Sequence, residues 1–299
     1  MDRNRPGSLV ASLQRLATPL LFVAPILILA TTFYFVPVFK AFMLSLQKWL
    51  IITGQDPEFV GLANYRELFG ERRFKIAFWN TVYYAVGTVP IGVAISLGLA
   101  LLLDAPIQFK AGFRAIFFIP VIIPRVVVAM IWGFMFGAYG GAVNQILQAF
   151  GAEPVRWLAN PDTAMNAIIV TSLWGGVGFN MVIFLAGLQS IPNEYHEAAR
   201  VEGANLWQQF VHITFPLLRP TLLFAVVIAT IASFQVFTQV FVMTEGGPAF
   251  STTTLVYYIY VSAFEHFRMG YAAAVAVILF LGLLLLSLIQ LRLLRSDYY

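Results

Sequence analysis

The sequence predicts an all-α protein that crosses a lipid bilayer with six transmembrane helices. Three observations support this: 60% of the 299 residues are hydrophobic, only 11% are charged, and the mean hydropathy is +0.82. Soluble domains average about 25% charged residues, so most of this chain must face lipid or other apolar helices. No linker or low-complexity stretch divides it, and we expect a single membrane domain over residues 1–299.

Six segments are long and apolar enough to cross about 30 Å of hydrocarbon at about 1.5 Å per residue. We predict spans at residues 16–39, 79–103, 115–138, 164–188, 220–243 and 271–291. The first span follows basic residues, as the apolar core of a signal peptide does. It is nevertheless long enough to cross the bilayer, and no small-residue cleavage site follows it, so we expect a retained helix.

The side of the membrane on which the termini lie follows from the number of spans and from the basic residues. Six spans place both termini on one side, and lysines and arginines are divided almost evenly between the two sides. Three arginines, Arg3, Arg5 and Arg15, precede the first span, whereas the basic residues of the long first loop are mixed with acids. This pattern favours cytoplasmic termini.

The longest amphiphilic insert between two spans is residues 192–216, PNEYHEAARVEGANLWQQFVHITFP. Pro192 and Asn193 favour a helix start, and Gly203 favours its end about three turns later. A second short helix is expected from about Asn205. It leads to Pro216, which suits the first turn of the next span because proline has no amide hydrogen to bond.

Polar groups inside the predicted spans are few. Arg125 is the only charged residue well inside one, directly after Pro124, where the helix is expected to loosen. A buried guanidinium needs a partner or water. Two interpretations stay open: Arg125 pairs with a neighbouring subunit, or it lines a translocation cavity and donates to a polyhydroxylated or anionic solute.

Two further groups of residues are candidates for solute contact. Ser172, Gly176 and Asn180 share one helical face, and Trp174 offers a ring that can stack on a sugar. Close helix packing through the small residues is the alternative. On the fifth span Gln235, Thr238 and Gln239 are expected to share a face, with interhelical hydrogen bonding as the alternative.

Several chemistries lack the residues that they need. The chain has no cysteine, and none of its four lysines follows a glycine, so a phosphate-binding loop for ATP is not expected. Its three histidines lack the spacing of a metal site, and its basic residues lie at span ends rather than in a stripe that would suit nucleic acid. We therefore expect a transport subunit that is not an enzyme and holds no metal or cofactor.

The insert also carries a motif. The triplet Glu197-Ala198-Ala199 is followed by Gly203, then by Ile213 ten residues later and by Pro216. This resembles the EAA loop of ABC-importer permeases. Residues 59–65, 79–81, 114–147 and 244–248 likewise resemble phrases of the carbohydrate-uptake branch, the maltose and glycerol-phosphate type. Arg125 is a departure, because maltose-type permeases usually place a small polar residue there.

The resemblance implies the type I ABC-importer permease fold in a bacterial or archaeal cytoplasmic membrane. It implies a second homologous permease subunit, two cytoplasmic ATPase subunits that bind ATP and Mg²⁺, and an extracytoplasmic solute-binding protein. The EAA-loop residues Glu197, Ala198, Ala199, Gly203, Ile213 and Pro216 would couple the chain to the ATPases. The solute would be a sugar or a related polyol or sugar acid, crossing near Arg125, Ser172, Gly176, Asn180, Gln235 and Gln239.

An ion-gradient-driven secondary transporter is the alternative from another transport class. Proton relays usually need an acid within the membrane, and no predicted span contains one. Sodium can be held by backbone carbonyls alone, so this alternative stays open.

Overall fold

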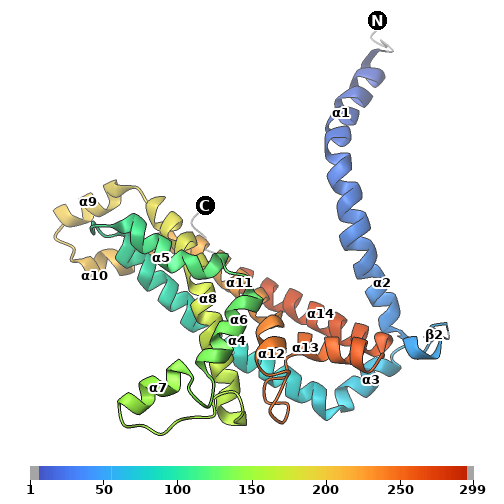
Figure 1. Cartoon of the computed structure of the whole chain (residues 1–299). Helices are drawn as coiled ribbons and strands as arrows, with labels where there is room; N and C mark the ends of the chain where they lie inside the picture. The colour runs from blue at the N-terminus through green and yellow to red at the C-terminus, as the bar shows by residue number, and fades with distance from the viewer. Residues whose placement is uncertain (1–6, 55, 295–299) are drawn as a thin grey trace, which may run out of the picture.

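The computed structural model describes residues 7–54 and 56–294, which are mostly helical (Figure 1). The elements before the central bundle are α1 (Gly7–Ala30), the π-helical turn η1 (Thr31–Phe35), α2 (Val36–Ser45), β1 (Gln47–Lys48), the 3₁₀ turn η2 (Ile51–Thr53), β2 (Glu58–Phe59) and α3 (Ala63–Gly70). The rest are α4 (Arg72–Asp104), α5 (Lys110–Ile122), α6 (Arg125–Met135), α7 (Ala142–Ala149), α8 (Pro161–Gln189), α9 (Asn193–Val201), α10 (Leu206–Gln209), η3 (Phe210–Thr214), α11 (Phe215–Phe234), α12 (Thr238–Met243), α13 (Leu255–Tyr260), η4 (Val261–Glu265) and α14 (Met269–Leu294).

Five of the described helical stretches are long and apolar enough to cross a membrane, or six if the bent pair α5–α6 counts as one span. The predicted spans 79–103, 164–188 and 271–291 fall within α4, α8 and α14. The first runs further than predicted, because the helix continues past Lys40 to Ser45. A lysine near a span end can extend its ammonium group to the interface and need not end the helix.

The N-terminal helix stands apart from the rest of the chain in Figure 1. In the most apolar stretch of Pro19–Ser45, no residue is buried against the rest of the chain. Of the two N-terminal helices, α2 is the one that packs against α14. The apolar side chains of α1 from residue 19 onward, among them Leu21 and Phe22 at 75% and 81% exposure, therefore face surroundings outside this chain.

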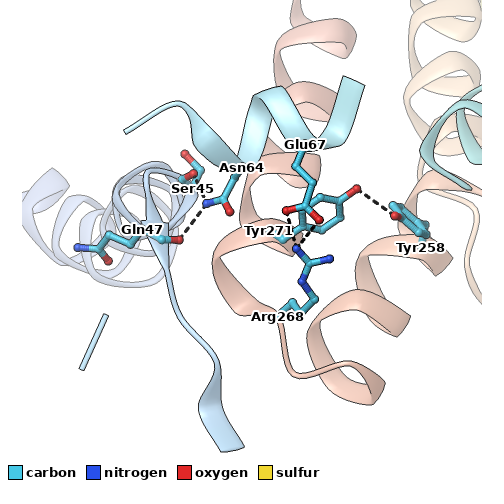
Figure 2. A network of polar contacts seen from close by, with 7 residues as sticks. All are labelled: Ser45, Gln47, Asn64, Glu67, Tyr258, Arg268 and Tyr271. Atoms are coloured by element: carbon cyan, nitrogen blue, oxygen red, sulfur yellow. Dashed lines mark hydrogen bonds and ion pairs between the residues drawn. The ribbon is translucent and has the colours of Figure 1, made fainter. Parts of the chain in front are cut away.

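A polar network joins the first interhelical segment to the start of α14 (Figure 2). Asn64 is buried, and its Nδ2 donates to the backbone carbonyls of Ser45 and Gln47, 2.9 Å from each. Arg268 Nη2 donates to both carboxylate oxygens of Glu67 at 2.7 Å. Asn64 lies in the segment 59–65, which resembles sugar permeases, and its hydrogen bonds attach that segment to the end of α2 and to β1.

The central bundle is α4 packed along α8, with α11 and α14 alongside. Glycines permit the close approaches. A side chain on Gly87 of α4 would come within 2.7 Å of Ile169, and one on Gly178 of α8 would overlap the Phe117 carbonyl of α5. Met181, Phe184 and Leu218 fill the core between α4, α8 and α11 at 0–1% exposure.

The predicted third span, 115–138, is two helices rather than one. The axes of α5 and α6 differ by 97°, and the break lies at Ile123 and Pro124. Proline disfavours helical backbone in the residue before it, and Ile123 is accordingly extended, with φ −70° and ψ 131°. The fifth span is also interrupted, because α11 ends at Phe234 and α12 begins at Thr238.

The short helix α7 is held at the end of the molecule opposite α9 by Asn144, which is 1% exposed (Figure 1). Its Oδ1 accepts from Val155 N and Trp157 Nε1, both at 3.0 Å, and its Nδ2 lies 2.9 Å from the Val155 carbonyl. α1 begins and α14 ends on the side of the bundle that carries α9 and α10 (Figure 1).

Candidate functional site

A cavity of about 290 Å³ opens near the middle of α4 and α8, beside the break between α5 and α6. Its walls come from α4, α5, α6, α8, α11 and α12. The polar residues that line it are Tyr84, Thr88, Arg125, Thr171, Ser172, Asn180, Ser233 and Gln239. A largely apolar hollow with a few convergent polar groups is the usual form of a small-molecule site.

The α8 face that the sequence singled out does line this cavity. Ser172, Gly176 and Asn180 all lie in its wall, together with Gly175. The buried Ser172 Oγ lies against the Tyr84 hydroxyl, its neighbour in the cavity wall. The small residues leave room beside α8 for a ligand, and contact with solute stays a prediction.

Arg125 is the first residue of α6 and lines the cavity at the helix break. The expectation that it lies well inside a continuous span is therefore wrong, whereas the predicted loosening after Pro124 is confirmed. Its side chain is exposed in this chain, and within the described residues it forms no ion pair or hydrogen bond. The pairing with a neighbouring subunit stays a prediction.

Gln239 and Gln235, predicted to lie on one face, are separated by the interruption between α11 and α12. Gln239 lines the cavity and is 7% exposed. Gln235 caps the end of α11, is exposed, and lies outside the cavity wall. The shared face is wrong because three residues between Phe234 and Thr238 leave the helix.

Trp174 also lies outside the cavity wall. Its ring packs edge-on against Trp132 of α6 with centroids 5.9 Å apart, and it is 41% exposed. Stacking on a sugar thus has no support from the geometry of this single chain.

Two cavity residues on α4 were missed by sequence analysis. Tyr84 and Thr88 lie one turn apart, and Thr88 Oγ1 donates to the Tyr84 carbonyl at 2.8 Å. The available signal was a pair of polar groups at i and i+4 in an otherwise apolar span.

The second candidate surface is the pair α9 and α10, which projects from one end of the bundle (Figure 1). No residue of α9 is buried, and the large apolar side chains Tyr195, Val201, Leu206 and Trp207 are 53–90% exposed. The surface is therefore both apolar and unoccupied by this chain, as a docking surface requires.

The predicted helix end at Gly203 is confirmed. Gly203 has φ +85°, its N donates to the Arg200 carbonyl at 3.1 Å, and Ala204 N donates to the Ala199 carbonyl at 2.8 Å. These bonds form the glycine-dependent helix ending known as the Schellman motif. α10 then starts at Asn205 through a capping box with Gln208.

A buried glutamine holds the two short helices together. Gln209 is 6% exposed, its Nε2 donates to the Ala204 carbonyl at 2.9 Å, and its Oε1 lies 3.3 Å from His196 Nδ1. His196, one of the three histidines without metal-site spacing, is half-buried against α10. These contacts fix α9 and α10 relative to one another.

The remaining motif residues divide between the outer face and the root of this loop. Glu197 and Ala198 are exposed on α9, while Ala199 is half-buried. Ile213 and Pro216 are half-buried where η3 runs into α11, and Pro216 occupies the first turn of α11 as predicted. Among the described residues, no group of three His, Asp or Glu side chains could hold a metal ion.

The family follows from comparison with known proteins. The profile of a family described as "binding-protein-dependent transport system inner membrane component" matches residues 77–296, more than half of the chain. The chain belongs to this family. It is a membrane component of a binding-protein-dependent ABC importer, and the alternative of an ion-gradient-driven transporter is not retained.

Individual relatives extend the match over nearly the whole chain. The arabinooligosaccharides transport system permease protein AraP of Bacillus subtilis (strain 168) is 34% identical over 93% of this chain and 88% of its own length. The sulfoquinovosyl glycerol transport system permease protein SmoG of Agrobacterium fabrum is 35% identical over 93% and 90%.

A solved structure supports the predicted fold. A chain of a bacterial ABC transporter involved in the import of the acidic polysaccharide alginate superposes with a TM-score of 0.84, covering 97% of this chain and 99% of that one at 23% identity. The type I ABC-importer permease fold is thereby confirmed.

Proposed function

We propose that this chain is one half of the translocation pathway of an ATP-driven importer for a sugar or a related polyol or sugar-acid solute. The observation that carries the proposal is that α8 lines the interior cavity and ends at Gln189, directly before the exposed and internally braced loop 192–216. The relatives AraP and SmoG, permeases of arabinooligosaccharide and sulfoquinovosyl glycerol transport systems, support the solute class.

The cavity is proposed as this chain's share of the solute site. Arg125, Ser172, Gly176, Asn180 and Gln239 are the residues proposed to line the path. A second, homologous permease would close its open side.

The loop 192–216 is proposed to dock on one of two cytoplasmic ATPase subunits, which would bind ATP and Mg²⁺. Glu197 and Ala198 would meet the partner, Gly203 would set the angle of α9, and Ile213 and Pro216 would transmit its movement to α11. Because α1 begins and α14 ends on the α9 side, both termini would be cytoplasmic, with α7 on the extracytoplasmic side near the binding protein (Figure 1).

Mechanistically, closure of the ATPase pair would push α9, and the spans would rock as rigid bodies to alternate access to the cavity. This chain would contribute no hydrolysis of its own, so the free energy of ATP binding would act on it from outside.

The test is copurification from the native membrane, followed by ATPase and uptake assays with the binding protein. The panel pairs neutral and acidic solutes of similar size: galactose with galacturonate, glucose with glucuronate, and glycerol with glycerol 3-phosphate. Recovery of two ATPase chains and a second permease, with uptake that stops when ATP is withheld, is expected. Uptake by this chain alone under an ion gradient would overturn the proposal.

A further inference from the structure

The break between α5 and α6 places an unusual combination of groups at one point of the cavity wall. Arg125 begins α6, so a cation lies at the positive end of the helix dipole, where it is unfavourable. The position is unfavourable for an arginine for a second reason, because the surrounding spans are apolar and solvate a charge poorly.

Nothing in the described part of the chain neutralises this charge. None of the described residues that line the cavity is acidic. Arg125 also makes no hydrogen bond to any described residue.

The first turn of α6 adds further unused donors. Its N-cap is Pro124, whose side chain caps nothing, and the first backbone hydrogen bond of the helix runs from Val128 N to the Pro124 carbonyl at 3.1 Å. The amides of Arg125, Val126 and Val127 therefore have no acceptor within the described residues. They point back toward the break, whose flanking residues Ile123 and Arg125 line the cavity.

An independent observation comes from α12, which packs against α6. Gln239 lines the same cavity and is only 7% exposed, yet in the described structure its amide forms no hydrogen bond. An amide that lines a cavity without such a partner is free to bond a ligand or water there.

We propose that the α5–α6 break binds the acidic group of an anionic solute, a carboxylate, phosphate or sulfonate. The Arg125 guanidinium and the first amides of α6 would hold its oxygens, and Gln239 would donate to a neighbouring oxygen. Arginine suits this task because its planar fork matches such groups. The inference rests on the proposed function for the transport step, and it narrows the solute to an acidic carbohydrate or polyol derivative.

The absence of cysteine from the chain allows a direct electrostatic test that needs no knowledge of the solute. A single cysteine is introduced as Ser172→Cys, or as Asn180→Cys if the first variant fails to assemble. Membrane vesicles carrying the whole complex are treated with a methanethiosulfonate bearing a sulfonate or one bearing a quaternary ammonium, and labelling of this chain is read by mass.

A unit charge about 10 Å away at an effective dielectric of about 20 changes the local concentration of a singly charged reagent by about tenfold. After correction for reaction with a free thiol, the anionic reagent is therefore expected to react at least about tenfold faster than the cationic one. Arg125→Gln should abolish this preference. Arg292→Gln, which removes an exposed cation at the end of α14, should preserve it.

Equal labelling by both reagents, or a preference that survives Arg125→Gln, would overturn the proposal. So would disassembly of the complex by Arg125→Gln, since that result assigns the arginine to a neighbouring subunit. Finally, if the uptake panel identifies a neutral solute, the anion site is refuted while the importer function stands. An acidic solute transported in preference to its neutral counterpart supports both.

Discussion

Gly203 offers the sharpest test of the loop 192–216, because a substitution there changes the preferred backbone conformation without bringing the new side chain into contact with this chain. Its φ is +85°, and a Cβ built there would meet nothing within 4 Å. A substitution is therefore opposed by backbone conformation alone. For an L-residue in the left-handed region the cost is about 1–2 kcal/mol, and for a β-branched residue it is larger.

The competing term is the pair of hydrogen bonds that end α9, from Gly203 N and Ala204 N. At about 0.5–1.5 kcal/mol each, the two bonds stabilise this helix end by about 1–3 kcal/mol. The two terms are comparable for Gly203→Ala, which should shift the loop's conformational equilibrium by about 5–30-fold. Gly203→Val should open the helix end altogether. Gly203→Asn should remain close to the unmodified protein, because asparagine tolerates this region.

The assay is solute uptake per ATP hydrolysed by the reconstituted complex, with membrane insertion measured in parallel. We expect the ratio to fall in the order Asn, Ala, Val, with insertion unchanged. Normal coupling in Gly203→Val would refute the loop as a lever. An asparagine variant as impaired as the valine variant would show that side-chain bulk at a partner contact matters, and not the backbone of Gly203.

Three further predictions concern side chains that fix the loops. Asn144→Leu removes the acceptor of Val155 N and Trp157 Nε1, at about 1–3 kcal/mol for each group left unpaired, and it should speed proteolysis around α7. Gln148→Leu, on the exposed face of α7, should not. Gln209→Leu breaks the contacts to Ala204 and His196 and should accelerate hydrogen exchange across residues 193–209, with unchanged exchange contradicting its bracing role. Glu67→Gln should lower stability by no more than about 1 kcal/mol, because the Glu67 and Arg268 side chains are 46% and 39% exposed. Asn64→Leu should lower the thermal midpoint further than Glu67→Gln, because Asn64 is buried and donates to the Ser45 and Gln47 carbonyls (Figure 2). The reverse order would refute the view that Asn64 stabilises this segment more than the Glu67–Arg268 pair does.

Local patterns predicted the elements whose signals are local. The apolar lengths of α4, α8 and α14, the stop at Gly203 and the start at Asn205 depend on hydropathy and on backbone preference within a few residues. The three-residue interval between α11 and α12 carries no comparable signal, because neither glycine nor proline occurs at residues 235–237. The assignment of Gln235 and Gln239 to one face failed for that reason.

The cavity residues likewise fall into those that local sequence patterns could predict and those that they could not. The α8 face of Ser172, Gly176 and Asn180 could be predicted, because one helix supplies all three at regular spacing. The convergence of Tyr84, Arg125 and Gln239 could not, because they come from three helices whose relative placement depends on packing at glycines such as Gly178.

The sequence by itself determined that the chain is a helical membrane protein, where most of its spans lie, and that the loop at 192–216 carries the motif of its family. These are properties of composition and of residue order, which hydrophobicity and backbone sterics translate directly into structure. Only the tertiary structure decided that the third span turns through 97° at Pro124 and that Arg125 and Gln239 meet at one cavity. The direction of a break and the meeting of distant side chains are set by the sum of packing contacts around them, and no single stretch of sequence contains that sum.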